Sequence, residues 1–343
     1  MARFVSSSLV GFLLLGACGE PAKVRQPGPV VLGVSGSGGD AGAGGEAAQP
    51  AGGGADIGVP DLPHPEPIGA PCNGAALLCE SPYDGTAFAV THASMASSGS
   101  FWDFPAQRRS IRQQLDDSIR GLMLEVHDYG GKPTLCFQDC DRGRSALTTE
   151  LGHVRGFLDD NPREVVTLLI DNRVSAADIA AAFDAADLSR YLYADPSPAP
   201  WPTLGALIDE GTRLVAFLSD ADAAPAGFRS LHGAVAATGA SFTNRRDLTC
   251  DLAKDGEDGA FLLVNQFLVT SDGEGGTGGE SSEAPAGLPS EALAETVNHD
   301  PFLSERLGSC ADYLGRKPSF VAVDFYDTSD VIGAVQRIND VIR

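Results

Sequence analysis

The sequence predicts an α/β fold, a TIM-type (β/α) barrel in a single domain. Apolar runs that read as buried strands alternate with amphipathic or alanine-rich runs that read as helices, and this alternation is typical of parallel sheets. Six or seven such units occupy about 270 residues, close to the usual size of such a barrel. A doubly wound open sheet is the alternative, but no glycine-rich phosphate loop follows the first expected strand.

The expected elements follow one another in regular order. The first strand is 86–92, and a helix at 106–120 follows it, with Ile111, Leu115 and Ile119 four residues apart. The next strand is 121–128, and a short polar turn leads from it to a second strand that carries Cys136. The remaining strands are expected at 164–171, 213–220, 260–269 and 319–327, and the remaining helices at 146–160, at 176–186 and from about residue 330.

The expected strands end in polar side chains. Glu125 and His127 stand two residues apart, so in a strand both side chains point to the same face. The other strands that end in a polar residue do so at His92, Asp171, Asp220 and Asp324. Because the carboxyl ends of barrel strands carry the active site, we expect these side chains to form a functional site.

The composition argues against two classes of partner. The formal net charge of -22, without a basic run, argues against nucleic-acid binding. The same negative field repels an anionic membrane surface, so local groups would have to recognise an anionic lipid. At 43% hydrophobic residues, the chain can bury a sizeable core.

The first 69 residues predict export rather than a folded domain. Residues 1–18 read as a signal peptide whose LGAC ending resembles the lipobox of bacterial lipoproteins, so Cys18 is expected to be lipidated. The alternative is an ordinary signal peptide with a chance cysteine. Residues 19–69 are rich in Gly, Ala and Pro and predict a disordered tether to the cell envelope, with Gly19 favouring the outer membrane. The barrel is expected over 70–343, with a low-complexity insertion near 271–288.

Six cysteines remain after Cys18, an even number that favours disulfides in an exported protein. Sequence proximity suggests three pairings, although spacing alone does not determine connectivity. A zinc site is the alternative, but no CxxC pair is present and export favours oxidation. The suggested pairs are Cys72 with Cys79, Cys136 with Cys140, and Cys250 with Cys310.

Six segments resemble, in the right order, the X domain of phosphatidylinositol-specific phospholipase C and its secreted relatives, the PLC-like phosphodiesterases. They are VTHASM (90–95), RQQLDDSIRGLMLEVHD (112–128), TLCFQDC (134–140), FLDDNPREVVTLLIDN (157–172), PWPTLGAL (200–207) and FVAVDFY (320–326). The resemblance runs from about residue 70 to the end of the chain. Glycerophosphodiester phosphodiesterases share the barrel, but they open with His-Arg-Gly where this chain has His92, Ala93 and Ser94.

The resemblance implies a reaction and roles for four residues. In the family one histidine takes the proton of the inositol 2-hydroxyl as it attacks phosphorus, and a second protonates the departing oxygen. An arginine or a calcium ion stabilises the charge on the phosphorus. His92 matches the general base, Glu125 and Asp171 match calcium-ligand positions, and Asp324 is expected to orient His92. Glu125 and Asp171 could alternatively be solvated or ion-paired acids at strand ends. Arg120 reads as a charge at a helix end.

Two departures from the family pattern limit this expectation. Ala93 follows His92 where the family commonly has Asn or Asp, and Phe137 stands where the family has its second histidine. Phenylalanine cannot donate a proton, and loss of general-acid assistance costs about 10²- to 10⁴-fold in rate. His127 is a hypothetical replacement acid on geometric grounds, with a structural hydrogen bond as its alternative.

Three functions therefore follow from the sequence. The first is a phosphodiesterase of the phospholipase C type, active in lipid metabolism on an inositol lipid or similar phosphodiester, with His92 as base and calcium as a possible cofactor. The second is a pseudoenzyme that binds a phosphorylated ligand without cleaving it. The third is a structural protein whose barrel serves as a display platform. The joint retention of the polar strand ends argues against this third function. We expect a membrane-tethered or secreted monomer.

Overall fold

A computed structural model describes residues 69–341 except 196–198, 223, 254–258 and 272–286. The predictions of a signal peptide, a lipidated Cys18 and a tether fall on residues outside this part, apart from Gly69. Most of the predicted insertion near 271–288 also lies outside it. The two ends of that insertion meet, because Val269 and Pro289 form an antiparallel bridge.

The sheet is a curled parallel barrel, as the sequence predicts. It has ten strands in the described part, and eight of them follow the path β7-β6-β5-β2-β1-β10-β9-β8, with β3 and β4 off it. The pairing of β10 with β1 joins the first strand to the last, and no ladder joins β7 to β8 in the described residues. The path strands are β1 (Phe88–Thr91), β2 (Gly121–Asp128), β5 (Val166–Asn172), β6 (Leu214–Leu218), β7 (Phe228–Ser230), β8 (Val235–Ala237), β9 (Phe261–Asn265) and β10 (Phe320–Val323).

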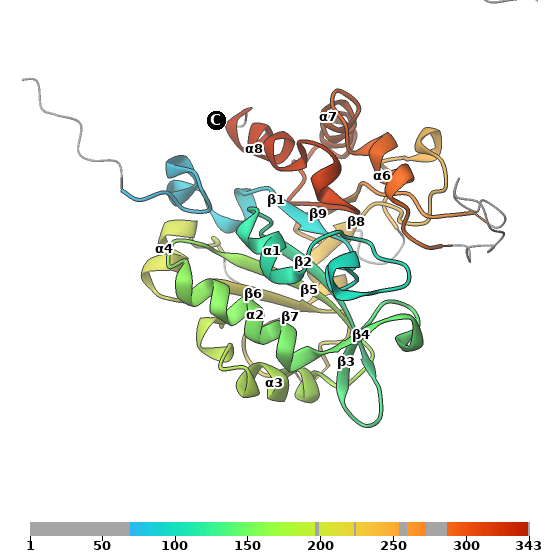
Figure 1. The fold of residues 1–343 in the computed structure, drawn as a ribbon. Coiled ribbons are helices and arrows are strands. Elements are labelled where there is room, and N and C mark those ends of the chain that lie inside the picture. Colours follow the sequence, from blue (N-terminus) through green and yellow to red (C-terminus); the bar gives the residue numbers. More distant parts are fainter. Residues whose placement is uncertain (1–68, 196–198, 223, 254–258, 272–286, 342–343) are drawn as a thin grey trace, which may run out of the picture. The chain divides into compact units, whose positions relative to one another are not determined.

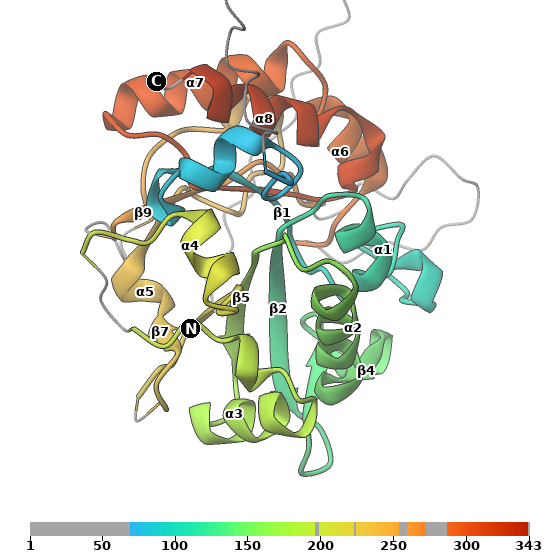
Figure 2. The ribbon, with the colours of Figure 1, turned by 90° about the vertical axis from the view of Figure 1, so that its left-hand side faces the viewer.

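Helices lie outside the sheet (Figures 1 and 2). In Figure 1 the green helices α2 and α3 lie on one side of the strands and the red α7 and α8 on the other. Their bounds are α1 (Ile111–Asp116), α2 (Leu147–Asp160), α3 (Ala176–Ala185), α4 (Leu204–Asp209), α5 (Leu231–Ala234), α6 (Glu291–Val297), α7 (Phe302–Leu314) and α8 (Val331–Val341). None of the helices among these residues is long and apolar enough to cross a membrane.

The path strands are buried on both faces, which explains their continuous apolar runs. One face contributes to a core inside the barrel, with Phe88, Phe217 and Phe320 among its members. The other face packs under the helices, with Leu124 and Ile170 among its members. Because successive side chains alternate between these two cores, position in a strand decides which residues reach the barrel interior.

The predicted helix at 106–120 is shorter in the structure and begins only at Ile111. Gln107 is fully buried, and its side-chain amide donates to the carbonyls of His92 and Val323 at 2.8 and 3.0 Å. This crosslink between two strand ends keeps the preceding segment out of the helix. Ser110 and Gln113 then form a capping box, which starts the helix one residue later.

All three disulfides suggested by proximity are present: Cys72–Cys79, Cys136–Cys140 and Cys250–Cys310. The second bond closes the turn that follows β3 (Pro133–Cys136), the strand that pairs antiparallel with the end of β2. The hairpin continues into β4 (Arg144–Ala146). This hairpin rises from the carboxyl end of β2 and therefore borders the expected site.

Candidate active site

The polar strand ends point into the barrel because they continue its interior face. Val90 belongs to the interior core, so His92, two residues later, points the same way. Ala322 likewise belongs to that core and is followed two residues later by Asp324. Thr91 pairs with Val323, and the His92 backbone N–H donates to the Val323 carbonyl at 2.9 Å. The two strand ends therefore place His92 beside Asp324.

His92 and Asp324 form a close pair. The His92 Nδ1 lies 2.8 Å from the Asp324 Oδ1, and the Asp324 side chain is only 1% exposed. Burial raises the pKa of the Asp324 carboxyl, and the charge of His92 and its hydrogen bond oppose that rise. Asp324 Oδ2 is buried without a hydrogen-bond partner among the described residues. The imidazole is thus the main group that offsets the cost of burying this carboxylate.

Two phenyl rings also hold the His92 ring. Phe267 stacks on it, with ring centroids 4.0 Å apart and planes 7° apart. Phe137 meets it edge to face, with centroids 5.5 Å apart and planes at 88°. With Asp324 at Nδ1, these contacts fix the ring plane and leave Nε2 as the nitrogen available to a ligand.

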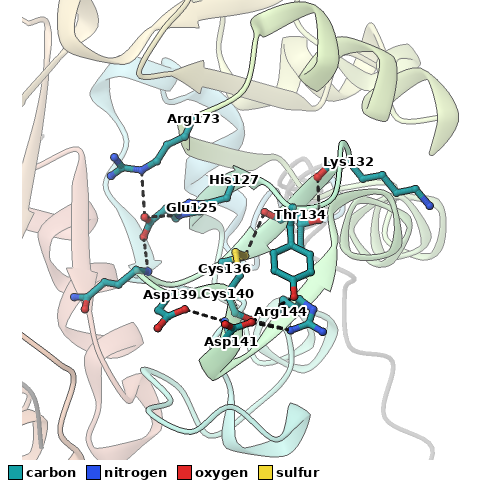
Figure 3. The surroundings of a disulfide bond; sticks show 12 residues. Glu125, His127, Lys132, Thr134, Cys136, Asp139, Cys140, Asp141, Arg144 and Arg173 are labelled. Atoms are coloured by element: carbon teal, nitrogen blue, oxygen red, sulfur yellow. Dashed lines mark hydrogen bonds and ion pairs between the residues drawn. A yellow bond between two sulfur atoms is a disulfide. The ribbon is translucent and has the colours of Figure 1, made fainter.

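A second polar group lies at the ends of β2 and β5. Glu125 and Asp171 are direct partners in the parallel register of these strands. Arg173 pairs with both, its Nε 3.4 Å from Glu125 Oε1 and its Nη2 3.0 Å from Asp171 Oδ2. The His127 Nε2 lies 2.7 Å from the same Glu125 oxygen, and Figure 3 shows Arg173 and His127 both directed at Glu125. Both acids are therefore ion-paired strand ends.

This cluster does not fit a calcium ion as it stands. Calcium takes six to eight oxygen ligands, whereas this site offers two carboxylates, each already paired with Arg173. In the part of the chain that the structure describes, no group of three or more His, Cys, Asp or Glu side chains is arranged to hold a metal. Arg173 would have to move away before an ion could bind between Glu125 and Asp171.

Phe137 sits in a loop that the Cys136–Cys140 disulfide closes. The next residue, Gln138, adopts the left-handed backbone conformation with φ +59°, which turns the chain sharply after the phenyl ring. Its backbone N–H donates to Glu125 Oε2 at 3.3 Å, and its side-chain amide donates to the Gly287 carbonyl at 2.9 Å. The loop is thus attached to β2 and to the end of the 271–288 insertion, which keeps Phe137 against His92 (Figure 3 shows the disulfide).

These groups surround a cleft of about 160 Å³ at the carboxyl ends of the strands. It is lined by His92, Ala93, Met123, Leu124, Glu125, Phe137, Leu169, Asp171, Leu231 and Leu263. A larger hollow, of about 920 Å³, is lined by residues between 69 and 82 and between 203 and 209, together with Arg163. We take the smaller cleft as the candidate site because His92 and the paired acids Glu125 and Asp171 line it.

The structure brings together most of the predicted site residues. His92, Glu125 and Asp171 line the cleft, and Asp324 lies behind His92. His127 is further away: the pairing of Thr91 with Leu122 puts His92 level with Met123, so His127 lies four residues, or about 13 Å, further along the strand.

Asp220, another predicted strand end, does not line the cleft. Its backbone N–H donates to the Asn172 side chain at 3.0 Å. Arg120 is a structural charge, as expected, because it pairs with Glu164 at 2.6 Å.

Three contributors to the site were missed from the sequence. Arg173 directly follows the strand that ends in Asp171 and Asn172, so its place after a polar strand end was the available signal. Phe267 and Gln107 gave no such signal, because Phe267 falls inside the expected strand 260–269 and Gln107 inside the expected helix 106–120. Ala93 has a φ of +42°, a strained value for alanine, at the position where the family commonly has Asn or Asp.

Comparison with known proteins agrees with the resemblance seen in the sequence. The family model described as "PI-PLC X 1" matches residues 78–231. A protein of Arthroderma benhamiae named "PI-PLC X domain-containing protein 1" is 28% identical over 78% of this chain and 89% of its own length. An "Uncharacterized secreted protein" of the same fungus is 26% identical over 80% of this chain, and the match spans 64% of that relative's length.

A plant relative and a solved structure complete the comparison. A "PI-PLC X domain-containing protein" of Arabidopsis thaliana is 26% identical over 69% of this chain and 55% of its own length. A phosphatidylinositol-specific phospholipase C of Staphylococcus aureus, solved with pentafluoro-Phe incorporated, aligns with a TM-score of 0.46 at 14% identity. That alignment covers 76% of this chain and 98% of the solved one.

Proposed function

We propose that this chain, which carries a PI-PLC X-type domain matched over residues 78–231, cleaves phosphodiesters with His92 as general base. The observation that supports this most directly is the His92–Asp324 pair, which lines a cleft at the carboxyl ends of the barrel strands. An imidazole is suited to the role because its unperturbed pKa lies near neutrality.

In this mechanism His92 Nε2 takes the proton of a hydroxyl group of the substrate while that oxygen attacks phosphorus. Asp324 acts through His92: it holds Nδ1 in place and stabilises the imidazolium that forms. Phe267 and Phe137 prevent the ring from turning away. The reaction therefore depends on one proton acceptor whose orientation is set by contacts on three sides.

Charge on the transferred phosphoryl group needs a positive partner. Arg173 is suited to this task because its guanidinium pairs with Glu125 and Asp171, which line the cleft, and is still 58% exposed. A guanidinium can bind two phosphoryl oxygens at once. Calcium binding stays a prediction, which isothermal titration of the protein with calcium, before and after Arg173→Ala, would test.

The proposed substrate is a phosphodiester such as an inositol lipid, because the relatives that resemble this chain are named for the PI-PLC X domain. We further propose that the chain is exported, as the name of one relative suggests. Anchoring through a lipid on Cys18 and a monomeric state are part of the same proposal.

The experiment is phosphorus NMR of phosphatidylinositol micelles incubated with the full chain, its His92→Ala variant and its Phe137→His variant. A cyclic inositol phosphate signal from the native or the Phe137→His protein, absent from His92→Ala, is the expected result. His153→Ala is the matched control, because His153 pairs with Glu150 on α2 and is not among the residues that line the cleft. No product from either the native or the Phe137→His protein would refute the proposal.

A second function, binding without turnover, is favoured by one observation: Phe137 occupies the wall of the cleft beside His92. In that case the native protein would bind an inositol phosphate in equilibrium dialysis and release no product over the same period.

A further inference from the structure

We propose that this cleft cleaves phosphodiesters whose departing oxygen is weakly basic, such as aryl esters, and discriminates against alkyl esters. The inference rests on the proposed function and narrows its class of substrate: an inositol lipid, whose departing oxygen is an alkoxide, would be turned over more slowly than an aryl ester. It follows from two features of the cleft: His92 can accept a proton there, and no described side chain is placed to donate one to the leaving group.

The side chain beside the general base provides no proton. Phe137 meets the His92 ring edge to face and is held there by the disulfide-closed loop. Around it the cleft wall is apolar, with Leu231 and Leu263 among the lining residues. A leaving group that packs against this wall meets hydrocarbon rather than an acid.

The other histidine near the site is held by one of the acids that line the cleft. His127 lies about 13 Å further along β2 than the level of His92, and its Nε2 is bound to Glu125. Among the described lining residues, the remaining titratable groups are Glu125 and Asp171. Both are held in ion pairs with Arg173, so neither is free to turn toward a leaving group.

The reaction then proceeds without protonation of the leaving group. The attacking hydroxyl oxygen forms a bond to phosphorus and gives its proton to His92 Nε2. The bond from phosphorus to the leaving oxygen breaks, and its electron pair departs with that oxygen as an anion. His92 afterwards releases its proton to water, so the ester gives a cyclic phosphodiester, an oxyanion and one proton. A phenolate is a stable anion in water, whereas an alkoxide is not.

The size of the discrimination follows from the missing acid. General-acid assistance contributes about 10²- to 10⁴-fold to rate, and it contributes most when the leaving group is strongly basic. An aryl ester loses little of this assistance and an alkyl ester loses most of it. We therefore expect turnover of an aryl ester to exceed that of an alkyl ester by at least about 10²-fold.

The test compares two myo-inositol 1-phosphate esters, para-nitrophenyl and n-hexyl, with the full chain and product measured by phosphorus NMR. We expect the ratio of aryl to alkyl turnover to be about 10² or more in the native protein. In Phe137→His this ratio should fall by about 10²-fold, since a proton donor now stands beside the leaving group. Phe137→Leu, which changes the ring without adding a donor, should keep the ratio high.

Three outcomes would overturn the inference, each in a distinct way. Comparable turnover of the two esters by the native protein would show that an acid is present, while the proposed function stands. A selective loss of alkyl turnover in His127→Ala would identify His127 as that acid. If neither ester yields product with any variant, the proposed function itself fails, and this inference with it.

Discussion

Replacing Asp324 with asparagine tests whether this buried carboxylate works through His92. The Nδ1 to Oδ1 distance of 2.8 Å and the 1% exposure of Asp324 describe a buried hydrogen bond to a charged group. Such bonds contribute about 1.5–3 kcal/mol, and each 1.4 kcal/mol in a barrier is about tenfold in rate. We expect Asp324→Asn to lower kcat by about 10- to 10²-fold, because the imidazolium formed in the reaction loses its negative partner.

The assay is steady-state hydrolysis of the para-nitrophenyl ester by the native protein, Asp324→Asn and Asp330→Asn. Asp330 is the control, since it pairs with Arg337 on the surface at 3.3 Å and is 70% exposed. A purely structural role would change the free energy of unfolding and leave kcat of the folded fraction intact. An unchanged kcat in Asp324→Asn would therefore refute the reasoning about the pair.

The same variant reveals the pH dependence of stability. Burial raises the pKa of the Asp324 carboxyl above its ordinary value, which is about 3.9 in an unfolded chain. At pH values between the pKa of the unfolded chain and the higher pKa of the folded state, the folded state holds more protons than the unfolded state. The free energy of unfolding therefore falls as pH rises through this range. Urea unfolding should show the native protein losing stability relative to Asp324→Asn as pH rises above the ordinary Asp range. A gain would contradict the assigned direction.

Two further predictions concern the barrel. A Cβ on Gly121 would lie 2.4 Å from a methyl group of Val90. We therefore expect Gly121→Ala to lower the free energy of unfolding by about 1–3 kcal/mol. A variant that unfolds in urea with the stability of the native protein would contradict this close approach. The Cys250–Cys310 disulfide spans 60 residues and the one beside Phe137 spans 4. By loop entropy, removal of the longer loop's bond should cost about 4 kcal/mol of stability and removal of the shorter loop's bond about 2 kcal/mol. Differential scanning calorimetry of the two double Cys→Ser variants measures both losses, and the reverse order would contradict the prediction.

Much of the fold could be predicted because its signals are local. A strand buried on both faces needs an apolar side chain at nearly every position, so 166–172 and 214–218 are recognisable in isolation. The three-residue strands β7 and β8 were missed, since a segment that short has no readable period. The helix predicted over 106–120 was too long because Gln107, which binds two distant carbonyls, overrode the local pattern.

The disulfides were predictable for a different reason. Cys72 with Cys79 and Cys136 with Cys140 are close in the chain, and short loops cost the least entropy to close. Proximity also suggested Cys250 with Cys310, and that bond is present. Nothing in the spacing, however, indicated that the Cys136–Cys140 loop would press Phe137 against the candidate base.

The sequence by itself determined the two-residue alternation that directs His92, Glu125 and Asp171 into the barrel, because strand geometry is local. Only the tertiary structure decided which of these groups touch. His92 and Asp324 are 232 residues apart in the chain, and their contact depends on the pairing of the first strand with the last. The attachment of Arg173 to both acids depends likewise on the register of β2 against β5. Register arises from packing across the whole barrel, and no single segment contains that information.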